Sequence, residues 1–258
     1  MKSKGEKIKK ILIIFAAFCL VLMTGYQIFL PFLDFLQKKQ NQPANNEQQK
    51  NESELIINSQ GEENQPTKIE EDVFLKVPFV PQAPDAVWDD LHNEACEEAA
   101  LIMVHYFLKG EGLNKEIMEK EIQDLVAWQI ENWGGHKDLT IEEVGKMAKE
   151  YYDWQKIRIL DKITIEDIKK EIAAGNPVII PAAGRLLGNP YYRQPGPYYH
   201  MLVIRGYQKS KIITNDPGTK RGENFSYSEK VLYEAIHDWP GKNKDILEGE
   251  KRMLIIEK

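Results

Sequence analysis

Residues 77–100 read VPFVPQAPDAVWDDLHNEACEEAA and mark the start of the folded part of the chain. The first half contains three prolines, which restrict it to an edge strand or a loop because proline lacks the N–H that a central strand needs. The second half continues into ALIMVHYFLKG, where apolar side chains recur at helical spacing. We therefore expect a largely buried helix, with Asn93 as its N-cap and Gly110 as its end.

Further helices and then strands follow this first helix along the chain. Amphipathic spacing and capping boxes predict helices, and short runs of β-branched and aromatic residues predict strands. The helices are expected at 114–131, from Thr140 to about Tyr152 and from Thr164 to Gly175, and the strands at 177–183, 199–207, 211–215 and 253–257. Helices that precede strands indicate an α+β domain, here residues 73–258, whose helices pack on an antiparallel sheet.

Upstream of this domain lies a long apolar run. Residues 11–33 carry no charged side chain, and about 20 apolar residues suffice to cross a bilayer as a helix. Residues 1–10 contain five lysines and one glutamate, which predicts a cytoplasmic basic tail and places the rest of the chain outside. We expect a retained single-pass anchor in the cell membrane rather than a cleaved signal peptide, because the run is long and no small-residue cleavage site follows it.

Residues 34–72 are rich in Gln, Asn, Glu and Lys and contain little that could be buried. Such a segment does not recover the entropy lost on ordering, so it is predicted to be a flexible polar linker between the anchor and the domain. The whole 258-residue chain has a net charge of -6. The five lysines of residues 1–10 offset part of the negative charge, so the rest of the chain is more acidic than this value suggests. A domain of that charge is not expected to bind nucleic acid, which requires a basic face.

The chain has two cysteines, Cys19 in the apolar run and Cys96 in the domain. This number excludes a disulfide within the domain and a four-cysteine zinc site, and we expect neither a metal nor a cofactor. Cys96 lies in the first turn of the predicted helix, where free N–H groups and the helix dipole favour a thiolate. Glu97 and Glu98 share that turn and oppose a second anion there, unless they face away from the sulfur.

A nucleophilic cysteine needs a base, and the base needs a partner that orients it. His200 opens the predicted strand at 199–207, and Asp216 follows the next strand. Neighbouring antiparallel strands bring such residues side by side. On spacing alone, a packed histidine and a turn-forming aspartate remain open alternatives.

Residues 77–100, together with GPYYHMLVIRGY and ITNDPGT, resemble papain-type peptidases of family C39, the bacteriocin-leader or double-glycine peptidases, and especially their stand-alone relatives. The resemblance covers about residues 73–240 and implies a papain-like fold. It implies Cys96 as nucleophile, His200 as base and Asp216 as its orienting partner. It also implies that the side chain of Gln82 donates to the oxyanion.

The expected function is therefore that of a membrane-anchored, extracytoplasmic cysteine peptidase that hydrolyses a peptide or protein substrate through Cys96. Two other functions remain open on the same scaffold. One is an acyltransferase or amidase that uses the same nucleophile. The other is a binding module that keeps the fold without catalysis, in which case the thiol would have an ordinary pKa near 8.5.

Overall fold

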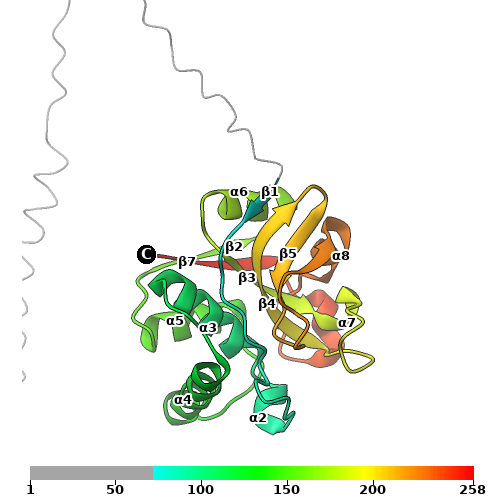
Figure 1. Ribbon diagram of the computed structural model, residues 1–258. Coiled ribbons are helices and arrows are strands. Elements are labelled where there is room, and N and C mark those ends of the chain that lie inside the picture. Colours follow the sequence, from blue (N-terminus) through cyan, green and yellow to red (C-terminus); the bar gives the residue numbers. More distant parts are fainter. Residues whose placement is uncertain (1–71) are drawn as a thin grey trace, which may run out of the picture. The chain divides into compact units, whose positions relative to one another are not determined.

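A computed structural model describes residues 72–258 of the chain (Figure 1). The helices in chain order are α2 (Asp90–Asn93), α3 (Cys96–Lys109), α4 (Lys115–Trp133), α5 (Ile141–Glu150), α6 (Ile165–Ala173), α7 (Gly184–Leu187), α8 (Glu229–Ala235) and the 3-10 helix η1 (Asn243–Glu248). The strands are β1 (Asp72–Phe74), β2 (Lys156–Asp161), β3 (Val178–Ala183), β4 (Tyr199–Gln208), β5 (Lys211–Asn215), β6 (Phe225–Ser228) and β7 (Arg252–Glu257).

The strands form one antiparallel sheet in the order β2-β7-β3-β4-β5-β6, and β1 pairs with the end of β4. The fold is therefore α+β, as predicted. β4 lies at the centre, where β3 pairs with its first half and β5 with its second half. The register between β4 and β5 shifts near Gly206, and a Cβ at this glycine would lie only 2.5 Å from the carbonyl oxygen of Val73. Glycine thus lets β1 approach the sheet closely at this point.

Successive side chains of a strand point to opposite faces of the sheet, and a hydrophobic core covers each face. On one face Ile179, Met201 and Leu254 belong to the core that the sheet shares with α3, α4 and α5. On the other face, Ile180 and Leu202 pack in a second core with α6 and α8 (Figure 1). The sheet accordingly reads as continuous apolar runs, which explains why 177–183 and 199–207 were recognisable as strands.

Helix α3 is the most buried helix of the described chain and carries Cys96 at its first position. The predicted N-cap, Asn93, is wrong: Asn93 ends the short helix α2, and Ala95 occupies the cap without a side-chain hydrogen bond. The predicted end at Gly110 is confirmed, because this residue adopts the left-handed conformation with φ of 71°. The buried surface of α3, rather than a cap, therefore holds its first turn in place.

The predicted basic tail, membrane anchor and linker lie outside the described residues, except for Asp72, which begins β1 one residue before the expected start of the domain. Between Asp72 and Lys258, no helix combines the length and apolar character that crossing a bilayer requires.

Candidate active site

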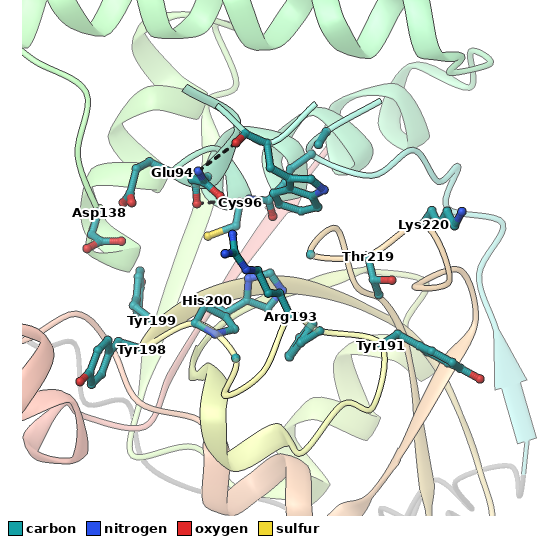
Figure 2. A pocket seen from close by; sticks show the side chains of 18 of the residues that line it. Glu94, Cys96, Asp138, Tyr191, Arg193, Tyr198, Tyr199, His200, Thr219 and Lys220 are labelled. Carbon is teal, nitrogen blue, oxygen red and sulfur yellow. Dashed lines mark hydrogen bonds between the residues drawn. The ribbon is translucent and has the colours of Figure 1, made fainter. Parts of the chain in front are cut away.

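A cavity of about 840 Å³ opens beside the first turn of α3 and the start of β4. Three of the four predicted site residues, Gln82, Cys96 and His200, line it. In Figure 2, Cys96 from α3 and His200 from β4 face each other across this cavity. The fourth residue, Asp216, is completely buried behind the histidine at the end of β5. The fold thus brings together side chains from four separate segments of the chain.

Cys96 is buried at the head of α3, with only 4% of its surface exposed. Its Sγ donates a hydrogen bond to Glu97 Oε2 at 2.9 Å. Burial raises the pKa of the Cys96 thiol well above its ordinary value, and the negative charge of Glu97 raises it further. Burial and Glu97 thus oppose the effect of the helix N-terminus, which by itself would favour a thiolate.

Glu97 does not face away from the sulfur, although neighbours on a helix usually diverge. Its Oε1 accepts from the backbone N–H of Leu139 at 2.8 Å, which turns the carboxyl group inward. The side chain is 1% exposed, and burial together with the nearby Glu98 raises its pKa well above the ordinary value. The second carboxyl group, Glu98, pairs with Gln129 on α4 instead.

His200 is the second residue of β4, opposite Ala182 of β3. Its Nε2 lies 2.8 Å from Asp216 Oδ1. Because an ionised carboxylate can only accept, Nε2 carries the hydrogen in the neutral ring. Nδ1 is then the unprotonated nitrogen, which is the form that a general base requires.

Asp216 accepts hydrogen bonds from several side chains at once. Oδ2 accepts from the hydroxyl groups of Tyr192 and Tyr227, each at 2.6 Å, and from Asn189 Nδ2 at 3.0 Å. Burial acts to raise the pKa of Asp216, but the charge of His200 and the hydrogen bonds from His200, Tyr192 and Tyr227 outweigh it and lower the pKa. Asp216 is therefore held as a charged acceptor for the histidine.

Gly218 completes this arrangement from the turn after β5. Its backbone N–H donates to Asp216 Oδ1 at 3.1 Å. A Cβ at this position would lie 2.9 Å from His200 Cε1 and 3.0 Å from Tyr192 Cε1. Only glycine allows the turn to approach the ring this closely, so the motif NDPGT fixes both the carboxylate and the space around the imidazole.

Gln82 is tied to two neighbouring segments and is 3% exposed. Its backbone N–H donates to Pro217 O at 3.0 Å, and its side-chain Nε2 donates to His92 O at 2.8 Å. Among the described residues, Nε2 also contacts Asn93 O, at 3.5 Å. The side-chain Oε1 has no hydrogen-bond partner within residues 72–258, and Gln82 lines the cavity that also contains Cys96.

The family model of the Peptidase_C39 like family matches residues 74–240. The chain belongs to this family. A crystal structure from Bacillus anthracis that carries the designation C39-like peptidase is similar to the chain at 18% identity, with a TM-score of 0.49, and the match covers 73% of this chain and 98% of that one. No curated protein matches the sequence. The resemblance noted from the sequence is thus confirmed, and membership indicates a peptidase that acts on a peptide or protein.

The cavity of this C39-like chain has two chemically different walls. The loop at 183–197 lines one side of the cavity and contributes Arg193 to it. Acidic residues, Glu94 and Asp138, lie on the other side of Cys96 in Figure 2. Burial and the charge of Glu94 raise the pKa of Asp138 to about 6.

Sequence reasoning did not find the residues that surround Asp216 in this C39-like fold. Asn189 and Tyr192 lie in the loop at 183–197, and Tyr227 lies on β6, which was not predicted. The Gly-, Pro- and Tyr-rich composition of the loop was the only available signal. No group of three or more His, Cys, Asp or Glu side chains within residues 72–258 is arranged to hold a metal ion.

Proposed function

We propose that this chain is a cysteine peptidase in which Cys96, His200 and Asp216 act as a triad and Gln82 supplies an oxyanion donor. The observation that carries the proposal is the placement of His200. One nitrogen of its ring contacts the buried carboxylate at 2.8 Å, and the ring also lines the cavity that contains the Cys96 thiol. A base between an orienting carboxylate and a nucleophile is the arrangement that acyl transfer requires.

The reaction begins from the thiol form of Cys96, because burial and Glu97 disfavour the thiolate. As substrate enters, the Cys96 sulfur turns from Glu97 to His200, whose Nδ1 takes the thiol proton. The sulfur then bonds to the carbonyl carbon of the scissile peptide. The N–H of the Gln82 side chain and the backbone N–H of Cys96 stabilise the resulting oxyanion.

Collapse of this tetrahedral intermediate breaks the C–N bond. The protonated His200 gives its proton to the leaving amine, and the acyl group stays on Cys96 as a thioester. A water molecule, deprotonated by His200, then attacks the thioester carbon and releases the carboxylic acid product. The thiol recovers its proton from His200, and Asp216 keeps the ring oriented throughout both halves of the reaction.

The test compares the full chain with Cys96→Ala on a mixture of unfolded proteins, and the products are analysed by mass spectrometry. Loss of the nucleophile is expected to lower hydrolysis on the order of 10⁶-fold, below detection. Cys19→Ala serves as the matched cysteine control and should hydrolyse as the unchanged chain does. Full hydrolysis by Cys96→Ala would overturn the proposal.

A second candidate function is a binding module that uses the same cavity without catalysis. The raised pKa of the Cys96 thiol favours this alternative, because a neutral sulfur is a weak nucleophile. Iodoacetamide labelling separates the two: in a peptidase, His200→Ala should slow alkylation of Cys96 at pH 7, whereas in a binding module it should leave the rate unchanged.

The proposal places the peptidase outside the cell membrane, held by residues 11–33, whose uninterrupted apolar sequence supports an anchor. Fractionation of cells that express the full chain should find it with the membranes. Protease added to intact spheroplasts should digest the domain. Recovery of the full chain in the soluble fraction would contradict this location.

A further inference from the structure

A histidine outside the proposed triad lies between two carboxyl groups. His92, on α2, is 7% exposed. Its Nδ1 lies 2.7 Å from Asp89 Oδ1, and its Nε2 lies 2.9 Å from Glu119 Oε2 on α4. Since ionised carboxylates have no hydrogen to donate, both ring nitrogens must donate for both contacts to be hydrogen bonds. The geometry therefore fits an imidazolium that bridges the two segments.

The backbone of the same residue contacts the proposed oxyanion donor. His92 O accepts the hydrogen bond from Gln82 Nε2 at 2.8 Å, and this is the shorter of the two contacts of that nitrogen. Helix α2 has four residues, and one turn of helix is unstable without support from its surroundings. The Asp89 side chain caps it, and Glu119 connects it to the much longer α4.

We propose that His92 is a positioning residue for the oxyanion hole: its ring fastens α2 to α4, and its carbonyl thereby fixes the Gln82 amide. This inference rests on the proposed function, because it concerns the role given there to Gln82. It goes beyond that function because it connects the Gln82 amide, through His92, to the carboxylate of Glu119 on α4.

The pair of hydrogen bonds from the His92 ring to Asp89 and Glu119, here called the clamp, depends on pH because it requires the protonated ring. Burial acts to lower the pKa of His92, but the hydrogen bonds and charges of Asp89 and Glu119 outweigh it and raise the pKa above the ordinary value. These two carboxylates are the charged groups that face the ring. Lys115 and Lys120 of α4 pair with other carboxylates. The clamp is therefore intact at lower pH and is lost as the pH rises through the raised pKa of His92.

The first test is a double-mutant cycle on the full chain with His92→Gln, Gln82→Ala and the combined variant. Loss of an oxyanion donor typically costs about 10²- to 10³-fold in kcat, so Gln82→Ala should lose that much. His92→Gln should lose about tenfold in kcat, a part of this effect, with little change in KM. In the Gln82→Ala background, His92→Gln should cause no further loss.

Two controls separate positioning from general disruption. Alkylation of Cys96 by iodoacetamide forms no oxyanion, so His92→Gln should leave its rate unchanged. His105→Gln changes a half-buried histidine that contacts Trp154 instead, and it should leave kcat unchanged. Losses that multiply in the cycle, or an equal fall in alkylation and kcat, would overturn the inference.

The pH profile gives a signature that a merely structural role would not produce. The advantage of the unchanged chain over His92→Gln should disappear as the pH rises past the pKa of His92. Glu119→Gln removes one of the two charges that raise this pKa, so it should move the loss to lower pH. This variant also serves if His92→Gln does not fold. An advantage that is independent of pH in both variants contradicts the clamp.

An NMR titration of the full chain tests the clamp independently of enzymatic activity. The side-chain amide resonances of Gln82 should shift with the titration of the His92 ring, and Glu119→Gln should lower the midpoint of both. If the amide resonances of Gln82 do not shift as the His92 ring titrates, the inference is wrong even for an active enzyme. If the chain cleaves no substrate, the proposed function fails, and this titration still decides whether His92 holds Gln82.

Discussion

Asp216 and Glu97 are both buried carboxyl groups, and each contacts one of the two side chains proposed to react, His200 and Cys96. The pKa of Asp216 is lowered, whereas that of Glu97 is raised well above its ordinary value. Asp216, in the turn after β5, accepts from His200, two tyrosines, Asn189 and the backbone amide of Gly218. Glu97, in the first turn of α3, accepts from the backbone amide of Leu139 and the Cys96 thiol, and it lies near another acid, Glu98.

The comparison shows that burial alone does not decide the charge of a carboxyl group. Burial raises the pKa of both groups, and the number and sign of their neighbours then determine the outcome. Asp216 is held charged against His200, the proposed base. Glu97 raises the pKa of the Cys96 thiol, the proposed nucleophile.

The largest effect should come from removing the charge of Asp216. Asp216→Asn keeps the shape but cannot be relied on to accept from His200 Nε2, so the ring loses its tautomer and orientation. We expect kcat to fall on the order of 10²- to 10⁴-fold. Steady-state kinetics on any accepted peptide measure the change, and Asp124→Asn at the surface is the control. A fall below threefold would mean that the two carboxyl groups do not differ in function.

A smaller effect should follow from removing one donor to Asp216. Tyr227→Phe deletes a hydrogen bond of 2.6 Å to the carboxylate, so the pKa of Asp216 should rise towards its ordinary value. The stability that ionised Asp216 contributes is present above its unfolded pKa and is lost as the pH falls through its folded pKa, so the variant should lose less stability on acidification than the unchanged chain does. At neutral pH, urea unfolding should show a loss of about 1.5–3 kcal/mol.

Tyr233→Phe is the matched control for that measurement, since its ring lies against Lys251 rather than near Asp216. It should leave both the acid titration and the unfolding midpoint nearly unchanged. Equal acid sensitivity in the two tyrosine variants would show that the hydroxyl group of Tyr227 does not hold the charge of Asp216.

The smallest effect, with the opposite sign, should come from Glu97→Gln. Glu97→Gln removes the carboxyl group whose charge and hydrogen bond raise the pKa of Cys96, so this pKa should fall and more thiolate should be present at pH 8. We expect iodoacetamide to label Cys96 about three- to tenfold faster, since one pKa unit changes the thiolate fraction about tenfold. Glu131→Gln, at an exposed position, controls for net charge. Slower labelling of Glu97→Gln would reverse the role given to this carboxyl group.

The elements with the clearest apolar pattern were predictable from the sequence. β3 and β4 are buried on both faces, and the capping box Thr140–Glu143 marked the start of α5. β2 and β6 were missed. β2 reads KIRILD and lies at an edge of the sheet, where half-exposed charged residues obscure the alternation, and β6 has only four residues. Short edge strands depend on pairing partners that local sequence does not contain.

In the candidate site, too, some residues were predictable from the sequence and others were not. Cys96, His200, Asp216 and Gln82 were predictable because they occur in short motifs. Their partners were not, since a contact such as Tyr227 to Asp216 depends on the turn between β5 and β6. The orientation of Glu97 was also beyond sequence reasoning: it is determined by the amide of Leu139, which lies 42 positions further along the chain.

The position of β1 has a mechanical consequence for any attachment through the preceding residues. β1 pairs with Gly206, Tyr207 and Gln208, at the opposite end of β4 from His200. Gln208 lies eight positions after His200 along the strand, about 26 Å at the usual rise. A force transmitted through Asp72 therefore enters the sheet at the end remote from the proposed triad. The three residue pairs between β1 and β4 are the first part of the sheet to bear it.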